Sequence, residues 1–239
     1  MLVKNDLYDY ENRYIYQDSD FFKFSLDSIL LAEFVKVSNN DVKILDMCAG
    51  NMAIPLILSK YTTSKIVGFE IQKKVYDLGK KSIELNNLSQ QLSIINDDVK
   101  NMGNYFSKES FNIMLCNPPY FKYNESKVLN EKVELRLARH EITLTLENIF
   151  ELAKSYLVNK GSLYLVHRVE RFDEIVYFGY KYHIYVKNVQ FITTKIPGKP
   201  YIVLVECIKN SKPGIKVNCE KCVEGVKSYQ NFFREEIWN

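Results

Sequence analysis

The most informative segment of the chain is Phe111-Asn112-Ile113-Met114-Leu115-Cys116, followed at once by Asn117-Pro118-Pro119-Tyr120. The first six residues form a short apolar run, which is typical of a strand buried on both faces of a sheet. The prolines then end the strand, because proline lacks an N–H group and fixes φ. The stretch predicts a buried strand with an amide and an aromatic ring held rigidly at its carboxyl end.

Strands and helices alternate on both sides of this stretch. Apolar runs predict further strands at residues 42–45, 65–69, 92–95 and 162–166. Apolar periodicity predicts a helix with Ser25 at its N-cap, and helices over 51–60, 72–87, 143–158 (ending at Gly161) and 172–181. Two β-rich runs, 184–194 and 201–208, flank a Pro-Gly turn and predict a hairpin. This order predicts an α/β, Rossmann-like fold, with a mostly parallel seven-stranded sheet, an antiparallel terminal hairpin and helices on both faces.

Length and composition indicate one soluble domain. The chain has 239 residues, of which 46% are hydrophobic and 26% charged, and it contains no repeat or linker. We expect a single domain over 1–239, with 1–40 closing the ligand pocket and 209–239 forming a basic appendage. No stretch is apolar enough to span a membrane, and the first residues lack a signal-peptide core, so a cytoplasmic location is expected.

The five cysteines are irregularly spaced, which does not indicate a disulfide framework. Cys219 and Cys222 form a lone Cys-x-x-Cys, whereas a structural zinc site needs two more ligands. We therefore predict no metal site and expect free thiols. No obligate protein partner is implied either.

Polar residues follow each predicted parallel strand, where α/β sheets bind their ligands. Asp46 begins a loop that reaches Gly50, and Glu70 follows the next strand, 20 residues after that glycine. Such an acidic group is placed to bind the ribose hydroxyls of an adenosine-containing cofactor. Asp97 and Asp98 follow the third strand, and one of them could accept a hydrogen bond from an adenine amino group.

The loop itself retains one glycine of a fuller three-glycine motif, because Cys48 and Met52 occupy the other two places. Glycines are needed most where the backbone approaches a pyrophosphate closely. The loop therefore disfavours NAD and FAD and is compatible with S-adenosyl-L-methionine.

The residues after the central strand suit an exocyclic amine on a flat ring. Such an amine is a poor nucleophile, since its lone pair is delocalised into the ring. The Asn117 side-chain oxygen and the Pro118 carbonyl could accept its N–H bonds and return electron density to nitrogen. Tyr120 offers a face for stacking on the base. The alternative is a Pro-Pro turn that merely ends a strand.

Taken together, this order of motifs resembles a class I S-adenosylmethionine-dependent methyltransferase of the amino-methylating type. Residues 24–32, Phe-Ser-Leu-Asp-Ser-Ile-Leu-Leu-Ala, are similar to the N-terminal signature of the bacterial valine-tRNA adenine-N6 methyltransferases. Residues 138–141 (Ala-Arg-His-Glu) and 167–171 (His-Arg-Val-Glu-Arg) are similar to segments of the same family. The resemblance runs from residue 14 to residue 208, and Cys48 and Met52 depart from it. It implies N6-methylation of the adenine at position 37, just 3′ of the anticodon, by direct in-line methyl transfer.

The resemblance also implies roles for individual residues. Asn117, Pro118, Pro119 and Tyr120 would form the catalytic set and hold the target base. Glu70 would hold the ribose of the cofactor and Asp98 its adenine. The full cofactor-binding set expected is Ser25, Asp27, Asp46, Ala49, Gly50, Glu70, Ile71, Asp97, Asp98 and Asn117. Ser25 and Asp27 would close the pocket from the N-terminal side.

The positive charge of the chain is uneven. Residues 181–239 carry ten Lys/Arg against five Asp/Glu, a net +5, and the remainder carries 22 against 24, a net −2. Surplus positive charge suits a polyanionic partner such as tRNA, although a solvated basic face is the common alternative. The candidate RNA contacts are Phe121, Lys122, Arg136, Arg139, His140, Arg168, Arg171, Lys195 and Lys199.

Two alternatives remain beside the tRNA adenine methyltransferase. The same chemistry could serve another acceptor, namely a release-factor glutamine or a base of rRNA or DNA, because Asn-Pro-Pro-Tyr is shared among those relatives. The chain could also be a non-catalytic RNA-binding module whose glycine loop has eroded. Residues 121–132 form a polar stretch that predicts a mobile loop.

Overall fold

The structure is a computed structural model, which describes residues 2–7, 12–18, 25–37, 42–118, 144–195 and 197–224. Several predicted features fall outside these ranges. They include the loop at 121–132 and the segment 138–141, together with the first residue of the motif at 24–32.

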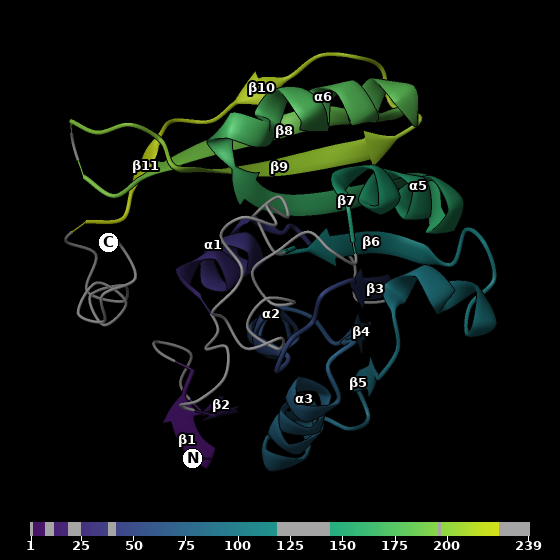
Figure 1. Cartoon of the computed structure of the whole chain (residues 1–239), viewed down its shortest axis with the longest axis vertical. Coiled ribbons are helices and arrows are strands. Elements are labelled where there is room, and N and C mark those ends of the chain that lie inside the picture. Colours follow the sequence, from purple (N-terminus) through teal and green to yellow (C-terminus); the bar gives the residue numbers. More distant parts are fainter. Residues whose placement is uncertain are drawn as a thin grey trace, which may run out of the picture.

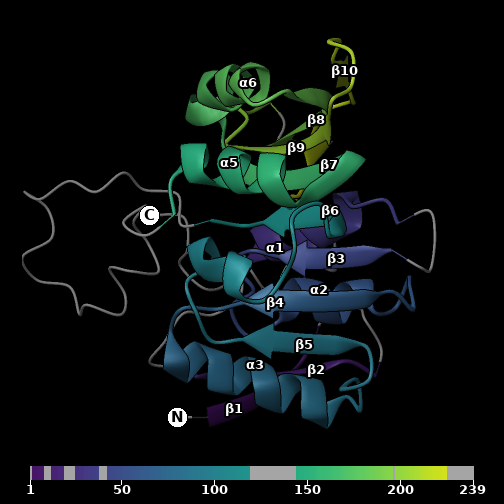
Figure 2. The ribbon, with the colours of Figure 1, turned by 90° about the vertical axis from the view of Figure 1, so that its right-hand side faces the viewer.

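Within the described ranges, the central sheet has nine strands in the order β10-β8-β9-β7-β6-β3-β4-β5, with β11 also paired to β8. Its first five members along the chain are parallel to one another: β3 (Lys43–Asp46), β4 (Lys65–Phe69), β5 (Leu92–Ile95), β6 (Phe111–Cys116) and β7 (Leu157–Arg168). The remaining long strands, β8 (Ile184–Thr193) and β9 (Ile202–Lys209), form an antiparallel hairpin, and β9 pairs antiparallel with β7. Figures 1 and 2 show this stack of strands. The predicted fold class is confirmed, and the described sheet has two short strands beyond the seven that were predicted.

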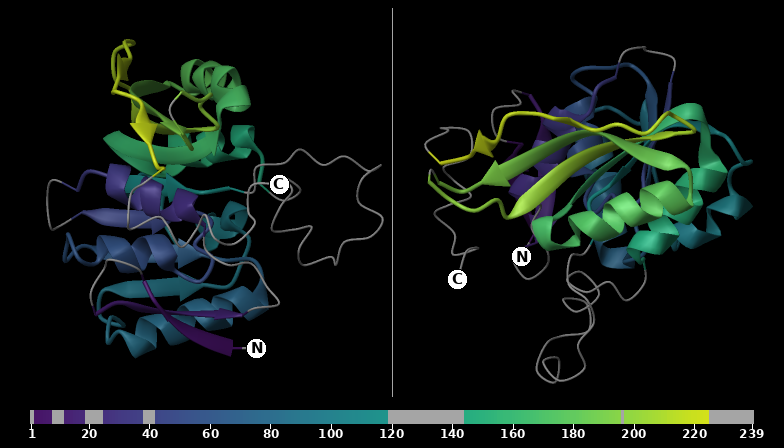
Figure 3. Two further views of the ribbon diagram at one scale, coloured as in Figure 1. Left: turned by 90° about the vertical axis from the view of Figure 1, so that its left-hand side faces the viewer. Right: turned by 90° about the horizontal axis from the view of Figure 1, so that it is seen from above.

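Helices cover both faces of the sheet, and each face has its own apolar core. One core joins the sheet to α1 (Leu26–Phe34), α2 (Ala53–Leu58) and α3 (Lys73–Leu85). The other core joins it to α5 (Leu146–Tyr156), α6 (Phe172–Lys181) and the 3₁₀ helix η1 (Val99–Asn104). A second 3₁₀ helix, η3 (Val169–Arg171), leads into α6, and Figure 3 shows the two helical layers from above.

The boundary between α5 and β7 differs from the prediction. Thr145 caps the helix through a reciprocal pair of hydrogen bonds with Asn148, so α5 begins there and not at residue 143. The helix ends at Tyr156, and Leu157 already pairs with Phe111 of β6. Gly161 therefore lies inside β7 and does not end the helix. A Cβ atom on it would lie 3.0 Å from the carbonyl oxygen of Asn112, so close strand contact favours glycine here.

Four short strands were missed by the sequence analysis. β1 (Leu2–Asp6) and β2 (Tyr14–Asp18) form a separate antiparallel hairpin that lies against α3. The Tyr16 N–H group donates to Ser82 Oγ at 3.0 Å, and the Asn86 side chain bonds both the N–H (2.9 Å) and the carbonyl (2.7 Å) of Tyr14. β10 (Lys216–Val217) and β11 (Lys221–Cys222) lie alongside β8.

None of the helices in the described ranges is long and apolar enough to cross a membrane.

Candidate active site

The polar residues predicted from the strand ends do lie along one edge of the sheet. β6, β3, β4 and β5 are neighbours and run parallel, so their carboxyl ends meet there. The loop after β3 is tied to the end of β6, because the Met47 N–H group donates to the Leu115 carbonyl at 2.9 Å. The same loop is tied to β4 through the Ala49 N–H group and the Phe69 carbonyl, also at 2.9 Å. The edge is a ready ligand site of the kind that α/β sheets provide.

Asp46 ends β3 and is completely buried. Its Oδ1 atom accepts the N–H group of Cys48 at 3.3 Å, whereas Oδ2 has no hydrogen-bond partner among the residues that the structure describes. The pKa of Asp46 is raised to about 7, mainly by burial and to a smaller extent by the charge of nearby Glu70, whereas the hydrogen bond from Cys48 lowers it. A buried carboxylate oxygen without a donor is costly, so this position favours a ligand that brings a hydrogen-bond donor or a positive charge.

Glu70 follows β4 and ties the loop to the next strand. Its Oε2 atom accepts the Gly50 N–H group at 3.1 Å, and its Oε1 atom accepts the Gln72 N–H group at 2.7 Å. Burial raises its pKa to about 7, although both backbone hydrogen bonds oppose that shift. Each carboxylate oxygen has more than one lone pair, so the side chain can still accept hydroxyl groups of a ligand. Ile71 beside it is 42% exposed and offers an apolar surface at the same edge.

Met52 replaces a glycine of the usual loop and nevertheless fits. Its backbone is left-handed, with φ at 73°, and its side chain is fully buried. Two glycines make room for it. A Cβ atom would lie 2.7 Å from the Met52 sulfur at Gly68 and 3.1 Å from Met52 Cγ at Gly79. Gly68 on β4 and Gly79 on α3 thus leave the space that the larger Met52 side chain needs.

Asp97 and Asp98 have different environments. Asp97 accepts hydrogen bonds from the Asp98 N–H group (2.7 Å), the Asn101 amide (2.8 Å) and the Tyr105 hydroxyl (2.9 Å), and the side-chain bonds lower its pKa. Asp98 caps η1 by accepting the Lys100 N–H group at 2.9 Å. Since Asp97 already holds three donors, Asp98 is the better placed of the two to accept from an adenine.

Asn117 lies just beyond β6, where it is half-buried, and Pro118 after it is buried. Its amide nitrogen donates to Ser28 Oγ on α1 at 3.0 Å. The other two members of the predicted catalytic set, Pro119 and Tyr120, lie outside the described residues. Ser28 was missed as a site residue, although it lies within the motif at residues 24–32.

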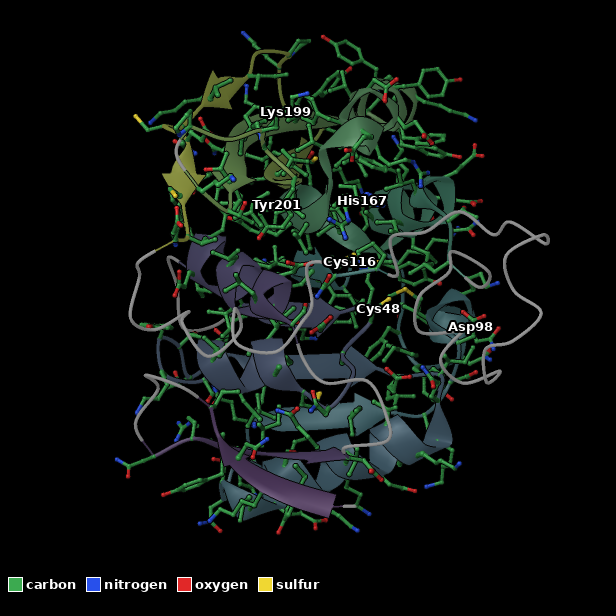
Figure 4. The ribbon with its side chains drawn as sticks, turned by 60° about the vertical axis from the view of Figure 1, so that its left-hand side comes forward. Cys48, Asp98, Cys116, His167, Lys199 and Tyr201 are labelled. Atoms are coloured by element: carbon green, nitrogen blue, oxygen red, sulfur yellow. The ribbon has the colours of Figure 1, made fainter. Side chains whose placement is uncertain are left out.

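The start of α1 lies near the site. Ser25 is the N-cap of α1, but its side chain makes no capping hydrogen bond. Asp27 is buried, and its charge helps to raise the pKa of Tyr201, after burial as the largest cause. The charge of Arg168 lowers the same pKa. Tyr201 is thus close to both residues, and Figure 4 shows it near His167 above Cys116 and Cys48.

The predicted RNA contacts differ in their surroundings. Lys195 and Lys199 are exposed in the turn between β8 and β9. Arg171 instead forms a bidentate ion pair with Glu174, at 2.5 and 2.8 Å, and its side chain is 12% exposed. Arg168 ends β7 and is half-buried. The remaining predicted contacts lie outside the described residues, namely Phe121, Lys122, Arg136, Arg139 and His140.

In the part of the chain that the structure describes, no three His, Cys, Asp or Glu side chains come together as metal ligands. Cys219 and Cys222 are free thiols there.

The chain is similar to known methyltransferases in sequence and in fold. The family model described as "Methyltransferase small domain" matches residues 23–174. The chain is 23% identical to a tRNA1(Val) (adenine(37)-N6)-methyltransferase of Bacteroides thetaiotaomicron, over 90% of this chain and 88% of that protein. It is 28% identical to a release factor glutamine methyltransferase of Thermodesulfovibrio yellowstonii, over 54% of this chain and 47% of that protein. Its fold is similar to that of TYW2 from Pyrococcus horikoshii in complex with MeSAdo, with a TM-score of 0.62 at 16% identity, over 88% of this chain and 72% of that one.

Proposed function

The chain belongs to the methyltransferase small domain family, and on that premise we propose that it methylates N6 of the adenine at position 37 of valine tRNA. The methyl donor is S-adenosyl-L-methionine. The observation that carries this proposal is the anchored carboxamide of Asn117 at the end of β6, beside a loop whose Asp46 has a buried oxygen with no partner among the described residues. The match over most of both chains to the Bacteroides tRNA enzyme supports the choice of acceptor.

The residues at the sheet edge fit the donor chemically. Asp46 Oδ2 would accept from, or pair with, the cationic methionine end, which removes the cost of its unpaired burial. Glu70 would accept the ribose hydroxyls, and Ile71 would lie against the adenine. Ala49 and Gly50 would line the methionine end through backbone groups, and Asp98 would accept from the adenine amino group.

The loop favours this donor over a dinucleotide. A pyrophosphate needs glycines where the backbone must approach it closely, and Met52 occupies one of those places, with its side chain packed against Gly68 and Gly79. The donor supplies a sulfonium methyl group that is already strongly electrophilic. The protein therefore needs no covalent nucleophile, and its task is to position the amine and accept its protons.

Two oxygen acceptors at the end of β6 would activate the amine. The Asn117 amide donates to Ser28 through nitrogen, which commits its oxygen to the opposite side. The Pro118 carbonyl follows at a backbone angle that proline fixes. Both would accept the N–H bonds of the adenine amino group and raise the electron density on nitrogen. We assign Pro119 and Tyr120 to the same site by motif position, with Tyr120 stacked on the base.

The tRNA would bring its base to this edge by leaving the stack, at a cost of a few kcal/mol that is smaller in a loop than in a duplex. Lys195 and Lys199 would bind phosphates from the β8–β9 turn. Arg168 would bind a phosphate as well. Arg171 is less suited to bind one, because its guanidinium is already paired with Glu174.

Nucleoside mass analysis of tRNA tests the proposal directly. Purified protein is incubated with labelled donor and separate pools of tRNA, rRNA, DNA and protein. We expect N6-methyladenosine in the tRNA pool alone, at position 37 of valine tRNA when the RNA is mapped. Label in a release-factor glutamine would instead support the chemistry of the Thermodesulfovibrio relative. Donor that binds but labels no pool would contradict methyl transfer to any of these acceptors.

A further inference from the structure

The thiols of Cys48 and Cys116 lie 3.9 Å apart, sulfur to sulfur, at the centre of the candidate active site. Cys48 comes from the loop after β3, and Cys116 is the last residue of β6. Figure 4 labels the pair and shows the two side chains next to each other. We infer that they form a modification site, at which a peroxide joins them reversibly in a disulfide.

The backbone geometry permits this bond. β3 and β6 are adjacent parallel strands, and Asp46 of β3 pairs with Leu115 of β6. Cys48 lies two residues after Asp46, and Cys116 lies one residue after Leu115. Neighbouring strands lie about 4.8 Å apart, a spacing within the range of about 4.4 to 6.8 Å that disulfides span between Cα atoms, and the 3.9 Å between the two sulfurs shows that the side chains converge. The sulfurs then need to approach from 3.9 Å to a bond length of about 2.05 Å, a change that side-chain rotation can supply.

The exposure of the two thiols suits a reactive and a resolving cysteine. Cys48 is half-buried, whereas Cys116 is fully buried behind it. The remaining cysteines are far along the chain: Cys207 is fully buried in β9, and Cys219 and Cys222 lie in the C-terminal segment. Within this pair an oxidant reaches Cys48 first, and the Cys116 sulfur lies 3.9 Å from it. Cys219 is exposed as well.

The chemistry balances with hydrogen peroxide as the oxidant. The Cys48 thiolate attacks one peroxide oxygen, the O–O bond breaks, and the products are a sulfenic acid and water once a proton is taken up. The Cys116 thiol then loses its proton and attacks the Cys48 sulfur, which forms the S–S bond and releases the sulfenic oxygen as a second water. In total, two thiols are oxidised to one disulfide, and one peroxide is reduced to two waters.

The bond would disturb both halves of the active site. The Cys48 N–H group is held by Asp46 at 3.3 Å, and Cys116 directly precedes Asn117. The disulfide would fix the loop to the strand end beside Asn117, and misplacement of either by about 1 Å can cost about 100-fold in rate. This consequence for turnover rests on the proposed function, whereas formation of the bond does not.

Peptide mapping tests the bond independently of activity. The protein is treated with hydrogen peroxide, its remaining thiols are blocked, and it is digested with trypsin without reductant. We expect a cross-linked pair of peptides, residues 44–60 with residues 109–122, which separates on addition of dithiothreitol. A matched Cys219→Ser/Cys222→Ser variant should give the same cross-link, and Cys116→Ala should not. The absence of this cross-link, or one confined to Cys219 and Cys222, would overturn the inference.

Activity is measured on the same samples, with each variant normalised to its own untreated rate. We expect peroxide to lower methyl transfer by the unmodified chain at least about tenfold and dithiothreitol to restore it, whereas Cys116→Ala should resist. Donor binding by calorimetry separates the two proposals. If no RNA is ever methylated, the cross-link and its effect on donor affinity still report on the thiol pair. A cross-link that changes neither donor binding nor turnover would overturn its regulatory consequence.

Discussion

The Asn117 side chain is anchored to Ser28, whose hydroxyl oxygen lies 3.0 Å from the amide nitrogen. The two residues come from β6 and α1 and are separated by 89 positions in the chain. Because the amide nitrogen donates to the serine, the orientation of the amide oxygen is set by a helix that carries none of the strand-end motif. Ser28 is 6% exposed and is therefore itself held in place. The pair links the N-terminal helix to the proposed chemistry.

Ser28→Ala should slow methyl transfer while leaving donor binding intact. Without the serine oxygen the carboxamide can rotate, and the acceptor oxygen no longer faces the amine. We expect kcat to fall about tenfold with little change in the KM for the donor, and Ser28→Thr, which keeps the hydroxyl, to recover most of the rate. Steady-state kinetics at saturating tRNA measure both constants.

The exposed Ser107 provides a control, because Ser107→Ala removes the same atom away from the site. Equal losses from alanine and threonine at position 28 would show that the serine acts through packing alone.

Asn117→Ala should have a larger effect on the same step. It removes one of the two proposed acceptors of the amine protons, an interaction that strengthens as the methyl group transfers. By analogy with the loss of one preorganised hydrogen-bonding group elsewhere, we expect the single-turnover rate to fall by about 100- to 1,000-fold, with donor affinity nearly unchanged. Rapid quenching of a single turnover measures the chemical step. A near-normal rate would remove the amine-positioning role of Asn117.

The buried carboxyl of Asp46 should make the ligand-free protein less stable as pH rises. Its pKa is raised from 3.8 to about 7 in the fold, so between these values the folded protein binds more protons than the unfolded chain. Under that condition the free energy of unfolding falls with increasing pH. The decrease should run from about pH 4 to about pH 7 and level off above, with a size on the order of a few kcal/mol.

Asp46→Asn tests this pH dependence. The amide oxygen keeps the bond to Cys48 but cannot ionise, so melting temperatures of the ligand-free variant should depend less on pH over the same range. Some slope should remain because Glu70 has a raised pKa of about 7 as well. Identical slopes for the variant and the original chain would contradict the assignment. Donor affinity of the original chain should conversely rise with pH through this range, as both carboxyls ionise.

Gly68→Ala should destabilise the protein through the loop. A Cβ atom at this position would lie 2.5 Å from Ala49 Cβ and 2.7 Å from the Met52 sulfur, and both neighbours are buried. We expect the free energy of unfolding to fall by about 1–3 kcal/mol and donor affinity to fall with it. Gly103→Ala is the matched control, since its Cβ would meet only the hydroxyl of Tyr156. Urea denaturation and calorimetry measure the two effects.

The sequence was sufficient for the elements whose signal is local. β4, β5 and β6 have the predicted bounds, because each is a short buried apolar run between polar residues. The hairpin of β8 and β9 was predicted from its turn. β1 and β2 were missed because their stability comes from α3, which is far away in the sequence. There Ser82 and Asn86 accept hydrogen bonds from backbone N–H groups of β2.

The same division applies to the site. Asp46, Glu70 and Asn117 could be placed from their positions at strand ends, which the topology brings to one edge. The fit of Met52 could not be predicted, since it depends on glycines of β4 and α3 that only the fold brings to the loop. The ion pair of Arg171 with Glu174 was also unseen, although the three-residue spacing on a helical segment was a signal.

Substitution of a paired basic residue, Arg171, should differ in its effect from substitution of the exposed lysines in the β8–β9 turn. Lys195 and Lys199 are exposed, so a Lys195→Ala/Lys199→Ala variant should keep its melting temperature but bind tRNA more weakly, with a salt dependence reduced by about one to two counterions. Arg171→Ala should instead leave Glu174 without its bidentate partner and lower the free energy of unfolding by about 1–2 kcal/mol. Filter binding across a salt series and thermal melts separate the two effects. RNA affinity of the original chain that does not change with salt would refute the assignment of the β8–β9 turn as a phosphate-binding surface. A lowered melting temperature of the lysine variant would refute it too.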